Sequence, residues 1–227
     1  MKHEIGITQP PYLTEDWPGK YSVFSWLEYV ITVPNPIFLV TTRKANGAAN
    51  ANLHSWGFLV GEGEHYSSLL ALLDFTHTYA NILREGEWCL NFPSAELLPQ
   101  CSATIACNGS DNDEIIDAGF TIEPAQTVQA PRIAECAINV ECKLTWHRPL
   151  HEGSVWHLFV GHVQHVAMDE SAMIVTPEQR VANLGLMYNV RGTVNPLNGE
   201  FYGPNTLGLL NQVRRITPDV PGVNQSK

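Results

Sequence analysis

The sequence predicts a mostly β protein, an antiparallel, Greek-key-like barrel with a few short helices. Many short β-rich runs alternate with turn residues, as is typical of antiparallel barrels. The two longest runs, residues 137–146 and 154–168, have clear strand patterns, and only a few segments carry helix caps. The chain has 227 residues and no linker, so we expect one domain with an N-terminal extension (residues 1–33) and an extended C-terminal tail (residues 189–227).

The first strands follow an irregular segment in which residues 21–30 could form a short helix or a strand. Residues 37–42 are β-rich and are followed by turn residues. We therefore expect a hairpin whose return strand runs over residues 48–56. A loop over residues 61–65 then leads to a third strand over residues 67–75.

A short helix is expected after the third strand. Thr76 or Thr78 can cap its N-terminus, and Gly86 can end it. The next strand is expected over residues 87–92. This order places the end of a strand directly before the N-terminus of a helix.

Two more helices are predicted before the long strands. Ser94 fits an N-cap, and Pro99 is expected to limit the helix that follows. Residues 111–119 are acidic and resemble a short helix closed by Gly119. We interpret the charges of this helix as a solvated face.

The two long strands differ in pattern. Apolar and polar side chains alternate in residues 137–146, which predicts a sheet with one face in water. Residues 154–168 are apolar on both faces, as in a central barrel strand. Gly161 within them indicates a bend or a close backbone approach. From Asn189 onward, frequent Gly, Pro and Asn predict an extended tail.

Composition argues against several classes of function. The net charge is −10 and the 13 Lys and Arg residues are scattered, so we expect no nucleic-acid partner. No apolar run approaches the ~18 residues that span a bilayer, so we expect no membrane partner. Five cysteines without a CxxC pair predict a reduced, cytoplasmic protein with buried thiols. Because only 16% of residues are charged, we expect a partner subunit or a ligand to cover part of the surface.

A metal site is not expected, although there are nine histidines. His157 and His165 point the same way on one predicted strand but lie roughly 26 Å apart at ~3.3 Å per residue, and His162 points to the other face. Zinc ligands lie ~2 Å from the metal. The sequence also has no GxSxG elbow, no Rossmann GxGxxG and no P-loop. The nearest match, residues 61–63 (GEG), is interpreted as a turn.

A phosphate could bind where the third strand meets the helix, because free N–H groups and the helix dipole attract anions. Thr76, His77 and Thr78 supply two hydroxyls and an imidazole there. Alternatively, the threonines only cap the helix. In the neighbouring strand, residues 50–56 (NANLHSW) include small residues beside which a flat ring could lie. Their Asn and Ser side chains could form hydrogen bonds with the ring, and Trp56 could form an apolar wall.

Together these segments resemble the flavin reductase-like family of FMN-binding split barrels, in particular its flavoredoxin-like branch. The resemblance extends over roughly residues 34–188 and rests on four signatures in the family's order. They are FLVTT (38–42) with NANLHSW (50–56), THT (76–78) with Asn81, GEW (86–88) and Asn91, DEIIDAG (113–119) with APRIAEC (130–136) and ECKL (141–144), and HLFVGHV (157–163).

The resemblance implies a homodimer that binds FMN near the subunit interface. It assigns residues to the cofactor, namely Asn50, Ala51, Asn52, Ser55 and Trp56 on the flavin side, and Thr76, His77, Thr78 and Asn81 at the phosphate end. The family's lysine and aspartate in the phosphate triplet are Thr76 and His77 here. A protonated His77 could partly replace the lost lysine.

The resemblance also implies a catalytic residue. The reductases carry Gly-Asp-His near the nicotinamide, and this chain has Val155-Trp156-His157, so only the histidine is kept. His157 would orient the nicotinamide, or it could be a structural histidine of a barrel strand.

Three functions are consistent with the sequence. The first is an FMN-binding oxidoreductase, with hydride transfer from NAD(P)H to flavin N5. The second is a flavoredoxin-like FMN electron carrier that serves a redox partner protein and has no nicotinamide site of its own, which the altered Gly-Asp-His favours. The third is a barrel that has lost its cofactor and acts as a dimeric interaction protein.

Overall fold

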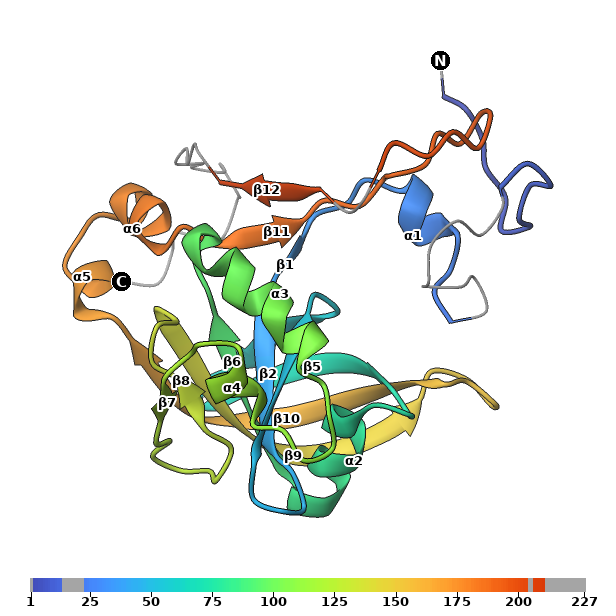
Figure 1. The fold of residues 1–227 in the computed structure, drawn as a ribbon. Coiled ribbons are helices and arrows are strands. Elements are labelled where there is room, and N and C mark those ends of the chain that lie inside the picture. Colours follow the sequence, from blue (N-terminus) through green and yellow to red (C-terminus); the bar gives the residue numbers. More distant parts are fainter. Residues whose placement is uncertain (1, 14–22, 204–205, 211–227) are drawn as a thin grey trace.

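A strongly curved antiparallel sheet dominates the computed structural model, which describes residues 2–13, 23–203 and 206–210 (Figure 1). Its strand order is β3-β2-β6-β9-β10-β5-β4. The strands are β2 (Phe38–Arg43), β3 (Ala49–His54), β4 (Gly57–Glu62), β5 (His65–Leu73), β6 (Glu87–Phe92), β9 (Ile138–Pro149) and β10 (Trp156–Met168). The prediction of a mostly β, antiparallel fold with few helices is confirmed.

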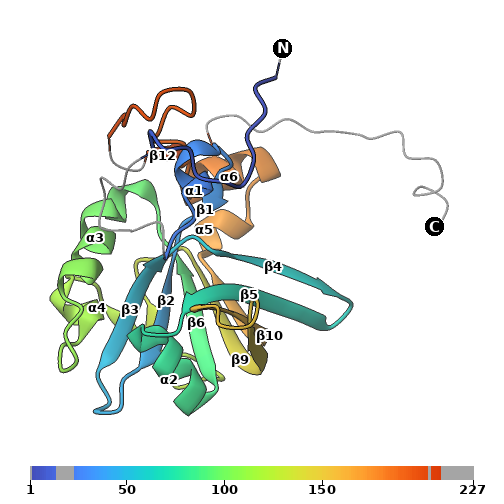
Figure 2. The same cartoon turned by 90° about the vertical axis from the view of Figure 1, so that its right-hand side faces the viewer.

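Short helices and two small sheets surround this sheet. The helices are α1 (Leu27–Val30), α2 (His77–Glu85), α3 (Leu98–Ala106), α4 (Glu114–Asp117), α5 (Glu170–Met173) and α6 (Pro177–Leu184). The small sheets are β1 (Asn35–Pro36) with β11 (Met187–Asn189) and β12 (Leu207–Leu209), and β7 (Ile122–Glu123) with β8 (Arg132–Ile133). Figure 2 shows α3 and α4 beside β3, and α2 at the lower end of the curved sheet. None of the helices in the described part of the chain is long and apolar enough to cross a membrane.

Strand β4 was missed by the sequence analysis, which expected a loop over residues 61–65. It pairs antiparallel with β5, from Gly57 opposite Leu70 to Glu62 opposite His65. Glycine has a low β propensity, and the exposed apolar side chains of β4 do not alternate regularly with polar ones. Residues 57–62 therefore form a strand because they pair with β5, and their local sequence alone does not predict one.

Helix α2 begins and ends as predicted, and α3 does not. Thr76 is the N-cap of α2, and Gly86 closes it with a φ of 72°. Pro99 lies in the first turn of α3, where the missing N–H costs no hydrogen bond. Pro99 therefore fits the start of α3, which begins at Leu98, and the expectation that it limits the helix was wrong. Ser94 precedes a 3₁₀ turn over Ala95–Leu97 and makes no side-chain cap.

Half of the polar face of β9 is buried, so the expectation of a face in water is wrong for Asn139 and Glu141, while Lys143 and Thr145 are exposed as expected. Asn139 and Glu141 are only 4% and 0% exposed. Glu141 accepts hydrogen bonds from Thr127 and from the Arg132 guanidinium. Burial by itself raises the pKa of Glu141, but hydrogen bonds from Thr127, Gln126 and Arg132 outweigh it and hold the pKa at about 2. Alternation alone cannot distinguish a wet face from a buried polar network.

Strand β10 is central, as predicted, and lies between β9 and β5. Its pairing with β9 shifts register between Val160 and Gly161. A Cβ on Gly161 would overlap the indole of Trp88. Of the bend or close approach expected at Gly161, the close approach is present, and the register shift marks an irregularity of the ladder at this position.

Part of the C-terminal segment that the sequence analysis expected to be extended is paired in a small sheet. Asn189 ends β11, which pairs with both β1 and β12, so residues 207–209 form a strand. Within the predicted segment 21–30, α1 forms a short helix. Residues 21–22 and 211–227 lie outside the described part of the chain.

Apolar side chains pack on both faces of β2 and its neighbours. One core contains Phe38, Val40, Leu72, Trp88 and Phe159, and another joins β2 and β3 to α3 and α4 through Leu39, Ala51, Cys101 and Ile115. Burial raises the pKa of the Cys101 and Cys142 thiols to about 12, so both are protonated near neutral pH.

Glu141→Gln is expected to lower the free energy of unfolding by about 3 kcal/mol at pH 7, because it leaves the buried Arg132 guanidinium without its counter-charge. Urea denaturation measures the change. The control is Glu123→Gln. Glu123 lies 3.9 Å from the same guanidinium but is 46% exposed, so its loss should cost less than about 1 kcal/mol. Equal losses in the two variants would contradict the account.

Acid denaturation tests the same carboxylate. The pKa of Glu141 falls on folding from its ordinary 4.5 to about 2. Its stabilisation is therefore complete above pH 4.5 and is lost as the pH falls from 4.5 towards 2. The unfolding free energy of Glu141→Gln should decrease less steeply with acid in this range. A wild-type slope in the variant would show that Glu141 does not carry this effect.

Candidate functional site

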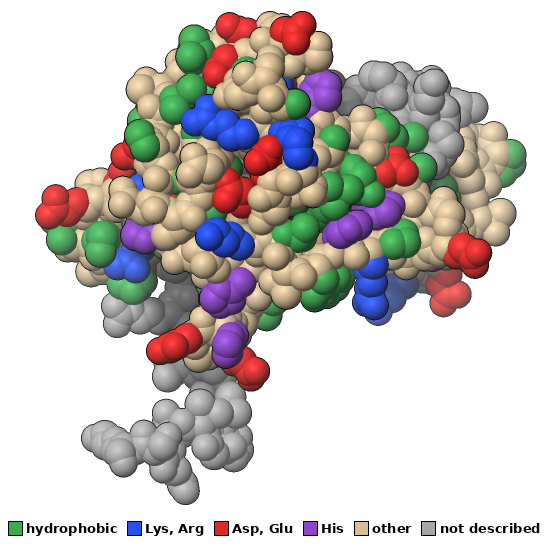
Figure 3. Space-filling model, turned by 90° about the horizontal axis from the view of Figure 1, so that it is seen from below, with side chains coloured by type: hydrophobic (Ala, Val, Ile, Leu, Met, Phe, Trp, Pro, Cys, Tyr) green, Lys and Arg blue, Asp and Glu red, His purple; other side chains and the backbone are tan. Residues whose placement is uncertain are grey.

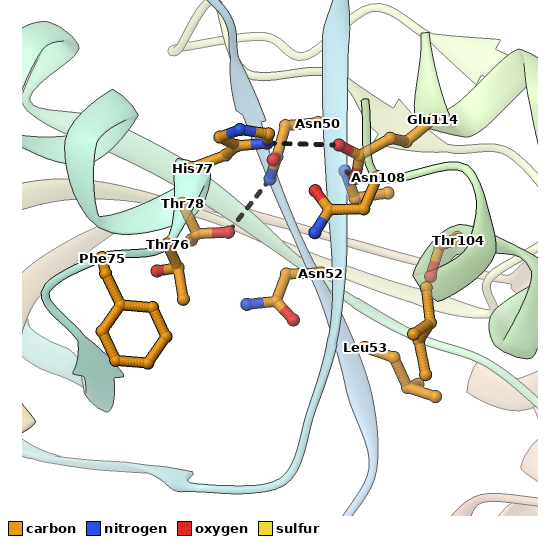
Figure 4. A pocket seen from close by; sticks show the side chains of 12 residues that line it. Asn50, Asn52, Leu53, Phe75, Thr76, His77, Thr78, Thr104, Asn108 and Glu114 are labelled. Carbon is orange, nitrogen blue, oxygen red and sulfur yellow. Dashed lines mark hydrogen bonds and ion pairs between the residues drawn. The ribbon is translucent and has the colours of Figure 1, made fainter. Parts of the chain in front are cut away.

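A cavity of about 220 Å³ opens between β3, the N-terminus of α2 and helix α3 (Figure 4). It is lined by Asn50, Ala51, Asn52, Leu53, Phe75, Thr76, His77, Thr78, Thr104, Ile105, Asn108 and Glu114. Carboxamides, hydroxyls and an imidazole share this wall with a few apolar side chains. Such a mixture suits a ligand with a flat apolar part and polar edges.

The N-terminus of α2 supplies anion-binding groups to the cavity. Thr76 has extended backbone angles and accepts a hydrogen bond from the Tyr79 N–H at 3.3 Å, while its hydroxyl donates to the Leu73 carbonyl at 2.9 Å. Its hydroxyl is thus engaged in capping. The N–H groups of His77 and Thr78, at the start of the helix, have no partner within it. Together with the helix dipole they favour a negative charge.

Thr78 and Asn50 connect α2 to β3. Both side chains are buried, and Asn50 Nδ2 donates to Thr78 Oγ1 at 3.0 Å (Figure 4). The Thr78 oxygen is the acceptor in this bond, so its own O–H is a donor for another group. Asn81, one turn further along α2, donates to Thr42 Oγ1 at 3.0 Å and does not line the cavity.

Glu114 forms a buried clamp that the sequence analysis did not foresee. Its Oε2 accepts the Ala51 N–H at 2.8 Å, and its Oε1 lies 2.9 Å from Lys44 Nζ. The neighbouring Asp113 accepts the Ala49 N–H at 3.1 Å. The expectation that the acidic charges of residues 111–119 form a solvated face is therefore wrong for these two residues.

His77 stands beside this clamp. Its Nδ1 is 4.0 Å from Glu114 Oε1 (Figure 4). The same nitrogen is buried and has no hydrogen-bond partner within the described ranges. A buried nitrogen without a partner is costly, so Nδ1 is available to a ligand in the cavity.

Ser55 and Trp56 lie just beyond the end of β3 and are not part of the cavity lining. Ser55 Oγ accepts a hydrogen bond from Asn189 at 3.3 Å. The Trp56 indole stacks on Phe24 with ring centroids 5.5 Å apart and lies 5.3 Å from Trp156. These residues form an aromatic cluster between the sheet and the N-terminal segment.

His157 is also outside the cavity lining. Its Nδ1 lies 3.5 Å from the Tyr79 hydroxyl, and its ring stacks beside His147 with centroids 6.1 Å apart. Figure 3 shows histidines next to apolar side chains on the surface seen from below. No three His, Cys, Asp or Glu side chains come together as a metal site in the described residues.

The structure thus brings part of the expected set together. The six that share the cavity are Asn50, Ala51, Asn52, Thr76, His77 and Thr78. Ser55, Trp56, Asn81 and His157 lie elsewhere. Glu114, Asn108 and Thr104 line the cavity but were missed, because only the packing of α3 and α4 on β3 brings them there.

Comparison with known proteins identifies the family that carries this site. A family model described as "Flavin reductase like domain" matches residues 30–189. The chain belongs to this family. The match includes β2, β3, α2 and every residue of the cavity lining. Membership places this chain among flavin-related oxidoreductase domains.

Solved structures share the fold of this flavin reductase-like chain. Nitrilotriacetate monooxygenase component B from Bacillus cereus has a TM-score of 0.74 at 15% identity, covering 94% of this chain and 100% of its own. Flavoredoxin from Methanosarcina acetivorans has a TM-score of 0.65 at 18% identity, covering 84% and 92%. An uncharacterized protein of Aquifex aeolicus is 26% identical over 179 residues, 76% of this chain and 85% of that relative. The expected split-barrel fold is confirmed.

Lys44→Met is expected to lower the unfolding free energy by about 3 kcal/mol, because the buried Glu114 carboxylate loses its counter-charge. Urea denaturation at pH 7 measures this loss. Lys143→Met, at an exposed position on β9, is the control and should change stability by less than about 1 kcal/mol. If Lys44→Met had the unfolding free energy of the wild type, Lys44 would not be the counter-charge that stabilises buried Glu114.

Proposed function

We propose that this flavin reductase-like chain binds FMN and acts as a flavin oxidoreductase with NAD(P)H as the electron donor. The observation that carries the proposal is the polar cavity between β3 and the N-terminus of α2. Bound flavin supplies the redox chemistry, and the residues of this chain bind, orient and shield it.

The cavity residues fit a flavin that ends in a phosphate. The N–H groups of His77 and Thr78 and the Thr78 hydroxyl can donate hydrogen bonds to a phosphate, and His77 Nδ1, which has no hydrogen-bond partner within the described ranges, can do so in the tautomer that carries its proton there. The Glu114 carboxylate is balanced by Lys44 at 2.9 Å, so it repels an anion less than a free carboxylate would. These groups compensate for the missing family lysine. The Thr76 hydroxyl caps α2, so Thr76 would contribute indirectly, by stabilising the helix N-terminus that binds the phosphate.

The flat part of the flavin would lie along β3. Asn50, Ala51 and Asn52 line the cavity, so a ring beside the strand would meet two carboxamide side chains. Ser55, Trp56 and Asn81 stay predicted contacts on the basis of the family resemblance.

We also propose a cytoplasmic homodimer in which the flavin lies near the subunit interface. Large apolar side chains on β4 and β9 support a second copy as partner: Phe58 is 58%, Val60 is 50% and Trp146 is 40% exposed. Burying such side chains is a main driving force of association. Buried free thiols at Cys89, Cys101, Cys136 and Cys142 are in keeping with a reducing compartment.

The second candidate function is a flavoredoxin-like FMN carrier that exchanges electrons with a redox partner protein. The position of His157 favours it, because this histidine contacts Tyr79 and His147 and does not line the cavity. Steady consumption of NAD(P)H by the purified protein with added FMN decides between the two. A reductase consumes it, and a carrier does not.

Thr78→Ala is expected to weaken FMN binding about tenfold, because it removes a hydrogen bond to a charged phosphate. Riboflavin, which has no phosphate, should bind the variant and the wild type alike. Flavin fluorescence titration measures both affinities. Thr78→Ser keeps the hydroxyl and is the control. Wild-type FMN affinity in Thr78→Ala would show that the phosphate binds elsewhere.

His157→Ala is expected to reduce NAD(P)H oxidation about tenfold with FMN affinity unchanged, if His157 orients the nicotinamide. The rate is followed at saturating FMN. His162→Ala is the control. Side chains alternate between the two faces of a strand, so His162, five residues after His157 on β10, lies on the other face. An unchanged rate in His157→Ala would remove this residue from the nicotinamide site.

A further inference from the structure

Arg191, directly after the short strand that ends at Asn189, has an unusual backbone conformation. Its φ is 61°, the only positive value for a non-glycine residue among those described. Such a conformation costs about 1 kcal/mol for a residue with a Cβ. Its N–H donates to the Asn189 side chain at 3.3 Å, which helps to hold it. A retained conformation of this kind suggests that the position of the Arg191 side chain matters.

The guanidinium of Arg191 lies against an aromatic wall. It sits over the Trp56 ring at 5.1 Å and is 12% exposed. Its Nη1 pairs with Glu28 Oε2, and Trp56 Nε1 donates to the same oxygen at 3.0 Å. Glu28 therefore balances the charge of Arg191 from one side only.

The other edge of the Arg191 guanidinium has no partner. Nε and Nη2 are both buried, and neither meets a hydrogen-bond acceptor within the described ranges. The N–H groups of these two atoms are parallel and form the fork that binds a carboxylate through two hydrogen bonds. In Arg132 the same edge is filled by Glu141. A buried charged donor without an acceptor is costly, so the Arg191 fork is a site prepared for an acceptor.

We propose that the Nε and Nη2 edge of Arg191 binds the carboxylate of a small aromatic acid. Glu28 already offsets the charge of Arg191, so a monoanion fits there better than a dianionic phosphate. Trp56 lies directly against Arg191, and Phe24 and Trp156 pack on Trp56, so the aromatic side chains beside the guanidinium favour an aromatic body. Arg191, Glu28 and Trp56 do not line the cavity at the start of α2, so carboxylate binding here can be tested separately from phosphate binding there.

Binding requires a covering group to move, because both nitrogens are buried. The part of the N-terminal segment around Phe24 would move, while Glu28 stays paired with Arg191. Phe24 stacks on Trp56, and Glu28, four residues later, bonds both Trp56 and Arg191. Phe24 contacts Trp56 and Trp156, so a shift of this segment changes the surroundings of both indoles. Tryptophan fluorescence therefore reports binding.

Calorimetric titration of the full-length protein with benzoate tests the site, with benzamide as a neutral probe of the same shape. Benzoate should saturate one site per chain and change the tryptophan fluorescence over the same concentrations. Benzamide should bind at least tenfold more weakly, because it lacks the charge and the second acceptor. Equal affinities for the two probes, or no saturation by benzoate, would overturn the proposal.

Arg191→Lys keeps the charge and removes the fork, so it should weaken benzoate binding at least tenfold and leave FMN affinity unchanged. Arg148→Lys is the control, because Arg148 also lies over an indole, that of Trp146 at 5.2 Å, on the exposed part of β9. It should bind benzoate like the wild type. Wild-type benzoate affinity in Arg191→Lys would overturn the site. If Arg191→Lys does not fold, the comparison of benzoate with benzamide on the wild-type protein still tests the proposed carboxylate site.

Discussion

The outer edge of β3 is the constraint on which the candidate site depends. An edge strand presents unpaired N–H groups that must be satisfied or protected. Asp113 and Glu114 accept the N–H groups of Ala49 and Ala51, and Lys44 neutralises Glu114. This arrangement fixes α4 against the strand, so that β3 forms one wall of the cavity and the start of α2 forms another.

Local signals in the sequence predicted the parts of the site that local chemistry determines. Thr76 and Gly86 mark the two ends of α2, and the hairpin of β2 and β3 follows from β-rich runs around turn residues. The segments 50–52 and 76–78 meet because β3 and α2 are neighbours in the fold. Their proximity was expected because the sequence analysis placed residues 50–56 in the strand neighbouring the junction between the third strand and the helix.

Long-range packing determines the features that the sequence did not predict. Glu114 is 63 residues from Ala51, so nothing near it indicates a buried clamp. Glu141 shares the alternation of an exposed strand face but is covered by the segment that contains Thr127 and Arg132. The positive φ of Arg191 has no sequence signal either, because arginine rarely adopts it. The segment that comprises β3 and the two residues after it nevertheless contributes to both sites, since Asn50 and Asn52 line the cavity and Trp56 lies against Arg191.

A crystal structure of the protein grown with FMN tests the central claim most directly. The account predicts the phosphate at the start of α2, within hydrogen-bond distance of the His77 and Thr78 N–H groups, and the ring beside Asn50 and Asn52. A phosphate bound elsewhere, with only solvent at these N–H groups, would contradict it.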